Sequence, residues 1–226
     1  MISHLSHYKT YALFLSYFII PFLSFIISYP ALSENKSEVN ITPELPYVDV
    51  IHKGKKIRIK RNPDKGNIVD LDFALTSRPC PPYCIQPIKL APGIETIGEL
   101  EILKYLQQSN QNNSTLIIDS REQHWLKKGM IPGAINIPWQ KLHNKTASED
   151  EISEILQLQF NVALTGKLWN FESAKTLVFY CNGPWCGQSP TNIHALLSIG
   201  YPAARIKWYR GGIQSWKMFG LTTVKP

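Results

Sequence analysis

Four cysteines, arranged in two close pairs, are the side chains of this 226-residue chain best suited to chemistry. Cys181 follows an apolar segment, residues 176–180, and Ser189 with the proline after it predicts a helix start. A loop between a strand and a helix N-terminus stabilises a thiolate, because its N–H groups and the helix dipole favour the anion. The sequence therefore predicts a nucleophilic Cys181 in a loop that binds anionic sulfur species. The alternative is a buried, inert cysteine.

The loop that follows Cys181 is expected to hold a bound sulfur species with its backbone amides. Its two glycines would let the backbone curl close to the sulfur atom. Cys186 either forms a disulfide with Cys181, and so resolves a persulfide or sulfenate, or packs beside Trp185. The expected binding residues are Asn182, Gly183, Pro184, Trp185, Gly187, Gln188 and Ser189.

The second pair, Cys80 and Cys84, encloses two prolines that bend the chain. We expect a disulfide here, because an even number of cysteines in an exported protein favours such bonds. A redox relay from this pair to Cys181 is the alternative. Neither pair has the spacing of a structural zinc site, and no metal or organic cofactor is expected.

The first 33 residues have the order of a secretory signal peptide. Lys9 is their only charged side chain, residues 11–28 are almost wholly apolar, and Ala31 and Ser33 supply the small residues of a cleavage site. The sequence therefore predicts an exported, periplasmic protein. The alternative is an anchor, since residues 11–28 approach the length of a membrane span.

Residues 34–92 are interpreted as an appendage that begins with a β-hairpin. Apolar and polar residues alternate from Tyr47 to Lys60 around a Lys-Gly turn, which favours two paired strands. Lys56, Arg58 and Lys60 share one face, which either keeps an edge strand soluble or docks an acidic protein or anionic surface. The net charge of +7 comes without any nucleic-acid-binding motif, so nucleic acid is not an expected partner.

The rest of the chain alternates between short apolar strands and helices. Strands are predicted at residues 115–119, 134–137, 176–180 and 206–209. Capping boxes predict helix starts at Thr96 with Glu99 and at Ser148 with Glu151. Buried strands alternating with helices predict an α/β fold with a parallel sheet covered on both faces. Ligands of such sheets bind beyond the carboxyl ends of the strands, where Cys181 is expected.

Four motifs in residues 93–226 together resemble a rhodanese domain. They are Asp119-Ser-Arg121 after a strand, Gly129 to Pro138, Val178 to Cys181, and Tyr209 to Trp216 with its Gly-Gly pair. The resemblance implies a five-stranded parallel sheet with helices on both faces. It also implies sulfur transfer through a persulfide on Cys181, with small sulfur-containing anions or protein thiols as partners.

The active-site loop departs from the family pattern. Ser189 lies eight residues after Cys181, whereas the family's common loop places its serine six residues after the cysteine, and Gln188 replaces an arginine. A loop without a cation predicts weak binding of thiosulfate, because charge-assisted hydrogen bonds are the stronger ones. Arg121 and Arg210 either supply the missing charge or form structural ion pairs.

Three functions follow from these observations. The first is an exported sulfurtransferase or persulfide carrier that uses Cys181 as nucleophile. The second is a thiol–disulfide redox protein that uses Cys181 with Cys186. The third is a non-catalytic rhodanese-like docking module that binds its partner through the basic hairpin.

Overall fold

The structure is a computed structural model that describes residues 38–226. The predictions for residues 1–33, a signal peptide or an anchor, lie outside this range. Among the residues described, no helix has both the length and the apolar character that a membrane crossing requires.

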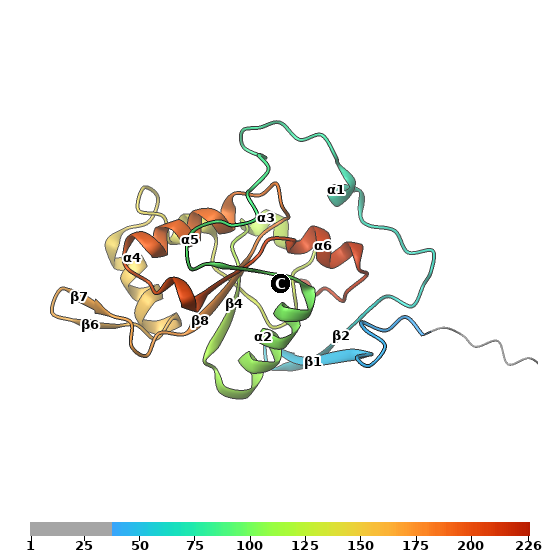
Figure 1. Ribbon diagram of the computed structural model, residues 1–226, viewed down its shortest axis with the longest axis horizontal. Helices are drawn as coiled ribbons and strands as arrows, with labels where there is room; N and C mark the ends of the chain where they lie inside the picture. Colours follow the sequence, from blue (N-terminus) through green and yellow to red (C-terminus); the bar gives the residue numbers. More distant parts are fainter. Residues whose placement is uncertain (1–37) are drawn as a thin grey trace, which may run out of the picture. The chain divides into compact units, whose positions relative to one another are not determined.

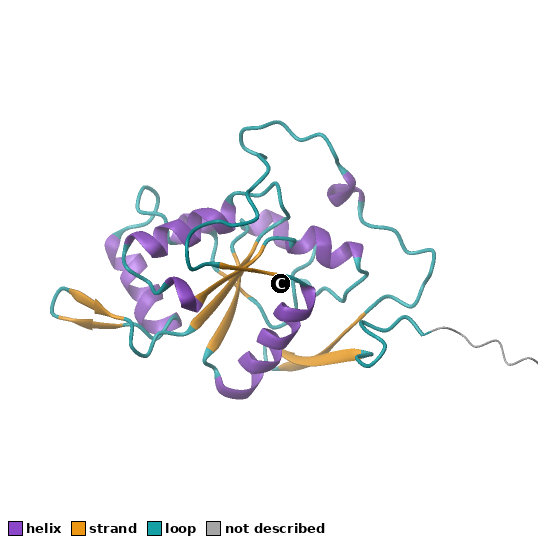
Figure 2. Cartoon of the chain, viewed as in Figure 1, coloured by secondary structure: helices purple, strands orange, loops and turns teal. Residues whose placement is uncertain are grey.

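Five parallel strands form the central sheet, in the order β3-β9-β8-β4-β5, which confirms the predicted fold class (Figures 1 and 2). Their bounds are β3, Glu95–Ile97; β4, Thr115–Asp119; β5, Ile135–Asn136; β8, Thr176–Tyr180; and β9, Ile206–Tyr209. Strands β4 and β8 end with Asp119 opposite Tyr180. Ser120 and Cys181 therefore leave the sheet side by side, at its carboxyl edge.

Helices cover both faces of this sheet, as predicted (Figure 1). The helices are α1, Leu71–Ala74; α2, Glu99–Asn112; α3, Gln123–Leu126; η1, Trp139–Lys141; α4, Glu149–Glu154; η2, Ile155–Gln159; α5, Gln188–Ser198; η3, Ala203–Arg205; and α6, Gly212–Met218. Alternate strand residues point to opposite faces. Ile117 and Val178 pack in one core with α2 and α6, and Ile118 and Phe179 pack in another with η2 and α5.

The start of α2 differs from the prediction. The capping box at Thr96 and Glu99 is wrong, because Thr96 lies in β3 and the helix begins after Gly98. The N–H of Gly98 donates to the Glu101 carboxylate at 3.1 Å, two residues later than expected. Leu100, the second residue of the helix, is exposed.

The predicted hairpin is present and contributes to the main core. It consists of β1, Tyr47–His52, and β2, Lys55–Lys60, which pair antiparallel. Val48, Val50 and Ile59 are buried in the same cluster as side chains of α2 and α6. Residues 38–226 accordingly form one compact unit, in which the hairpin of the predicted appendage shares its core with residues 93–226.

Two of the three cations on the predicted basic face are already paired within the hairpin. Lys56 Nζ and Arg58 Nε each lie 2.9 Å from the Asp49 carboxylate. The Arg58 guanidinium also lies 3.7 Å from the centre of the Tyr47 ring. Only Lys60 of the three has no ion-pair partner among residues 38–226, so this face carries less free charge than the sequence suggested.

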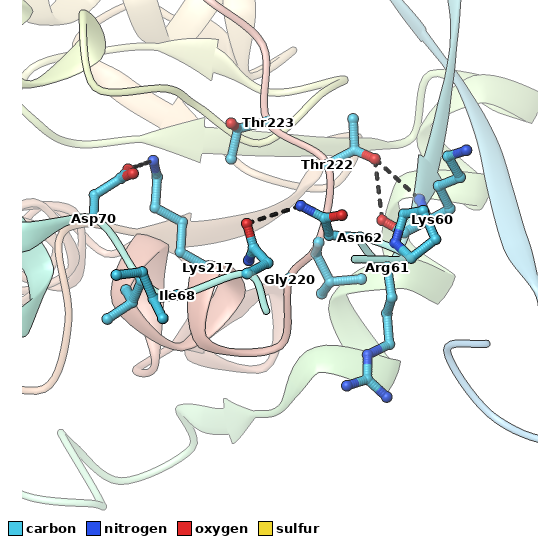
Figure 3. A pocket seen from close by; sticks show the side chains of 13 residues that line it. Lys60, Arg61, Asn62, Ile68, Asp70, Lys217, Gly220, Thr222 and Thr223 are labelled. Carbon is cyan, nitrogen blue, oxygen red and sulfur yellow. Dashed lines mark hydrogen bonds and ion pairs between the residues drawn. The ribbon is translucent and has the colours of Figure 1, made fainter. Parts of the chain in front are cut away.

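The C-terminal segment closes the hairpin side of the domain. The Lys60 N–H donates to the Thr222 hydroxyl at 3.1 Å, and the Asn62 N–H donates to the Gly220 carbonyl at 2.7 Å (Figure 3). A pocket of about 420 Å³ lies between these segments, and Asp70 and Lys217 form an ion pair in its wall.

A second small hairpin, β6, Ala163–Thr165, with β7, Leu168–Asn170, was not predicted.

Candidate active site

The loop that carries Cys181 is fixed by the N-terminus of α6. The Ile213 N–H donates to the Cys181 carbonyl at 3.0 Å, and the Gln214 N–H donates to the Asn182 carbonyl at 2.8 Å. Gly212 makes this approach possible, because its φ is +57° and a Cβ there would collide with the Cys181 carbonyl oxygen. The Gly-Gly motif therefore holds the base of the loop.

The Cys181 sulfur lies where several hydrogen-bond donors converge. The side chain is only 2% exposed, and Sγ lies 3.3 Å from the Cys186 carbonyl oxygen. Burial, the largest single influence, raises the pKa of the Cys181 thiol. Hydrogen bonds together outweigh the effect of burial, so the net pKa of Cys181 lies below its usual value. They come from the Cys186 thiol, the N–H and hydroxyl of Ser189 and the Gly183 N–H. Two loop amides thus support the thiolate, whereas the sequence suggested a larger set.

Cys186 has the opposite tendency. Burial first, and then the hydrogen bond to Cys181 and the charge of that neighbour, raise the pKa of Cys186 well above its usual value. Both thiols are free, and the Cys186 thiol donates to the Gln188 side-chain oxygen at 3.8 Å. When Cys181 is ionised, the Cys186 thiol stabilises that thiolate as a donor. Cys186 also lines a pocket that opens to solvent, whereas Cys181 lies behind it.

The rate at which Cys181 reacts with iodoacetamide is expected to rise with pH, with its inflection at a lower pH than for an ordinary thiol. Changing Cys186 to alanine removes a donor to the thiolate, so the inflection should move to higher pH. Labelling rates against pH, resolved by peptide mass, measure both effects in the reduced protein. An unchanged profile in Cys186→Ala would show that the Cys186 thiol does not stabilise the Cys181 thiolate.

Ser189 and its neighbours form a buried polar cluster behind the loop. Ser189 is not the N-cap that was predicted, because α5 begins at Gln188 and Gly187 is its cap. The Ser189 hydroxyl instead contacts Cys181 and lies in hydrogen-bond range of the Ser120 hydroxyl, at 3.2 Å, so it donates to one of the two at a time. The Asn192 amide also donates to Ser120, at 3.1 Å. Sequence reasoning assigned no role to Ser120, the middle residue of the Asp119-Ser-Arg121 motif, or to Asn192, three residues after Ser189.

The two loop glycines serve different purposes. A Cβ at Gly183 would lie 2.8 Å from the Gln214 side-chain oxygen, so this position needs a glycine. Gly187 has a negative φ, and a Cβ there would meet only the Gln86 side chain, at 3.8 Å. These neighbours do not include the Cys181 sulfur, so the role expected of both glycines in its approach stays a prediction.

Arg121 is in a structural ion pair. It is fully buried, and its Nε and Nη2 donate to the two Asp119 carboxylate oxygens at 2.8 and 2.6 Å. Nη2 also donates to the Gly129 carbonyl at 2.7 Å, and the Tyr180 hydroxyl donates to Asp119 at 2.8 Å. Burial lowers and the Asp119 charge raises the pKa of Arg121, with a net increase. This arrangement leaves no face of Arg121 open to a substrate.

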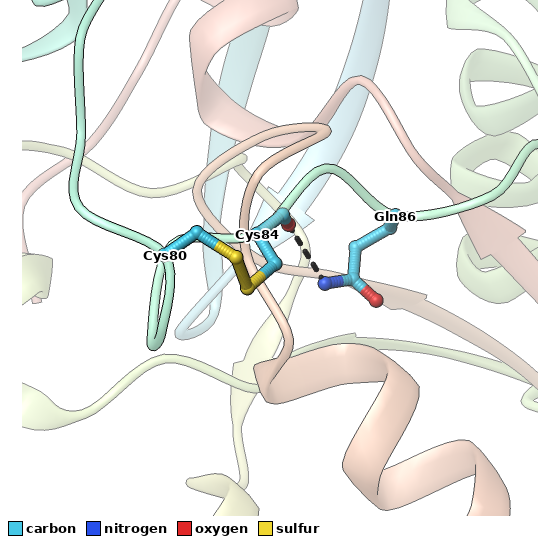
Figure 4. Close-up of a disulfide and its surroundings, with 3 residues drawn as sticks. All are labelled: Cys80, Cys84 and Gln86. Atoms are coloured by element: carbon cyan, nitrogen blue, oxygen red, sulfur yellow. Dashed lines mark hydrogen bonds between the residues drawn. A yellow bond between two sulfur atoms is a disulfide. The ribbon is translucent and has the colours of Figure 1, made fainter.

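Arg210 positions a segment that lies over the loop, residues 75–88, which we call the covering segment. Arg210 Nη2 donates to the Gln86 carbonyl at 2.7 Å, and the Gln86 N–H donates to the Pro184 carbonyl at 2.8 Å. Cys80 and Cys84 form a disulfide within this segment, with their Cα atoms 4.7 Å apart (Figure 4). Arg210 therefore contacts the loop through the covering segment, and it forms none of the expected structural ion pairs among residues 38–226.

A pocket of about 380 Å³ leads from solvent to Cys186, and we call it the entrance pocket. Its walls come from the covering segment, from the chain around α3 and η1, and from the loop itself. Aromatic rings dominate it, and Glu122 is its only acidic side chain; Asn182, Gln188 and Gly187 also line it. Of its rings, sequence reasoning found only Trp185, because Tyr83, Trp125 and Trp139 belong to no local motif.

Comparison with known protein families gives one match. Residues 102–219, more than half of the chain, match the family model of the rhodanese-like domain. No curated protein matches the chain.

Similar solved structures include a Bacillus halodurans protein, with 20% identity over 54% of this chain and 71% of that chain, at a TM-score of 0.38. The 3-mercaptopyruvate sulfotransferase of Escherichia coli has 23% identity over 53% of this chain and 40% of that chain, at a TM-score of 0.35. The human single-domain sulfurtransferase has 22% identity over 54% of this chain and 94% of that chain, at a TM-score of 0.36.

Proposed function

Because this chain belongs to the rhodanese-like domain family, we propose that it is an exported sulfurtransferase or persulfide carrier with Cys181 as its nucleophile. The observation that carries the proposal is the set of donors around the Cys181 sulfur, which lowers the pKa of that thiol despite its burial. A buried cysteine kept only for packing needs no such donors, and burial alone would raise its pKa. The Cys80–Cys84 disulfide supports export, since such bonds persist in oxidising compartments.

The proposed reaction has two steps. The Cys181 thiolate attacks the outer sulfur of a donor such as thiosulfate, a new S–S bond forms, and sulfite leaves with the electrons of the broken bond. The Gly183 and Ser189 donors that favour the thiolate also stabilise the persulfide anion in its place. An acceptor thiolate then takes the outer sulfur and returns Cys181 to the thiolate form.

Intact mass after incubation with thiosulfate, or with a small-molecule persulfide donor, tests this proposal. The wild-type protein is expected to gain one sulfur atom per chain, and a Cys181→Ser variant is expected to gain none. Cys186→Ser is the matched control, because it changes a neighbouring thiol and leaves the nucleophile. Equal sulfur gain by Cys181→Ser and the wild type would disprove the assignment.

A thiol–disulfide redox function is the second candidate, and the contact between the two loop thiols favours it. When Cys186 attacks the inner sulfur of a Cys181 persulfide, the two cysteines become a disulfide and the outer sulfur leaves as hydrosulfide. An external thiol must then reduce the disulfide before another turnover. The same mass experiment distinguishes the candidates, because this route gives a loss of two hydrogens in the wild type and a stable persulfide in Cys186→Ser.

A further inference from the structure

We propose that the entrance pocket selects a sulfur acceptor that carries an organic ammonium cation. The inference rests on the proposed function, because it concerns the molecule that meets the Cys181 persulfide. It depends on four features of the pocket: its rings, its charges, its free hydrogen-bond acceptor and its distance from the sulfur.

The rings form a cluster in which cations already bind. Trp185 lies 5.6 Å from Tyr83 and 6.3 Å from Trp125, measured between ring centroids. The Arg78 guanidinium, which lines a different pocket, lies 3.9 Å from the centre of the Trp185 ring. The faces of tryptophan and tyrosine rings attract cations, and more strongly where water is excluded. The ring surfaces toward the entrance pocket offer the same attraction to a ligand.

The charges around the pocket favour a cation over an anion. Glu122 lines the pocket, and Trp139 Nε1 donates a hydrogen bond to Glu122 Oε1 at 3.1 Å. No lysine or arginine lines the pocket; Lys128 stacks on Trp125 from outside it and is paired with Asp72. His124 also lines the pocket, with Nδ1 3.4 Å from Glu122 Oε2, and it is a cation only when protonated. While His124 is neutral, an anionic acceptor would meet a carboxylate that no lining residue compensates.

A free acceptor atom points to a ligand with a donor group. Asn182 is 1% exposed and lines the pocket, and its Oδ1 has no hydrogen-bond partner among residues 38–226. A buried oxygen without a partner costs free energy, so a ligand that donates to it would bind more tightly. Cys186 lines the same pocket and its carbonyl oxygen lies 3.3 Å from the Cys181 sulfur, so a ligand there lies next to a neighbour of the nucleophile.

The test compares choline with 3,3-dimethylbutan-1-ol, a neutral molecule of the same shape and with the same hydroxyl group. Binding to the full-length reduced protein is measured by calorimetry and by saturation-transfer NMR. We expect choline to bind at least about tenfold more tightly than the neutral alcohol, which corresponds to cation–π and carboxylate attraction together. Equal affinities, or no saturable binding of choline, would overturn the proposal.

Variants locate the site. Glu122→Gln keeps the shape and removes the charge, and should weaken choline binding about fivefold or more without changing binding of the alcohol. Trp125→Leu should also weaken choline selectively, whereas Glu149→Gln, an exposed control outside the pocket, should have no effect. Sulfur gain on Cys181 is measured in the same samples. Persulfide formation without choline selectivity rejects only the pocket inference, and selectivity without persulfide formation rejects only the proposed function.

Discussion

Replacement of Gly212 by alanine is expected to lower the free energy of unfolding by about 3 kcal/mol or more and to abolish persulfide formation on Cys181. The added Cβ would collide with the Cys181 carbonyl oxygen and would lie 2.8 Å from the Gly183 nitrogen. Both neighbours are backbone atoms of the active-site loop, so no side chain can move aside. Urea unfolding gives the first quantity, and intact mass after sulfur loading gives the second.

Gly166→Ala is the matched control for this substitution. Gly166 has a φ of +63°, close to the +57° of Gly212, and a Cβ there meets nothing within 4 Å. Its alanine variant should therefore show only the cost of the left-handed backbone, about 1–2 kcal/mol, and should load sulfur normally. If the two variants lose the same stability, the contact between α6 and the loop is not tight.

Arg121→Met is expected to cost about 3–5 kcal/mol of unfolding free energy, because it leaves the Asp119 carboxylate buried without its partner. The guanidinium is fully buried and also satisfies the Gly129 carbonyl, so no water replaces it. Thermal or urea unfolding measures the loss.

Two further variants test whether buried charge is the cause. Adding Asp119→Asn to Arg121→Met removes the unpaired charge and should restore part of the stability. Arg58→Met, which breaks an exposed pair with Asp49, should cause a much smaller change. A loss in Arg121→Met no larger than that in Arg58→Met would contradict a stabilising buried ion pair.

Local patterns predicted the elements that depend on local contacts. The capping box at Ser148 is present, with the Glu151 N–H donating to the Ser148 hydroxyl at 3.2 Å. The same pattern failed at Thr96, because pairing with Trp208 of β9 places Thr96 in a strand. A strand partner more than a hundred residues away leaves no trace in the neighbouring sequence.

In the candidate site, too, the features that depend on neighbouring residues were predictable and those that depend on distant residues were not. Cys181 was predictable, since a strand end, glycines and a helix start adjoin it in the sequence. The direction of the Ser189 hydroxyl was not, because it depends on Ser120 at the end of another strand. The entrance pocket was least predictable, because Tyr83 and Trp139 meet Trp185 only after three distant segments have packed.

The contacts between β2 and the C-terminal segment have a consequence for biosynthesis. Lys60 and its partner Thr222 are 162 residues apart, so the ribosome makes almost the whole domain before these two can meet. Until then Ile59 lacks Leu221, with which it shares a core. Long-range contacts of this kind delay folding, because the intervening chain must first be ordered. The part of the core that joins β2 to the C-terminal segment should therefore form late in folding, once Leu221 has been made.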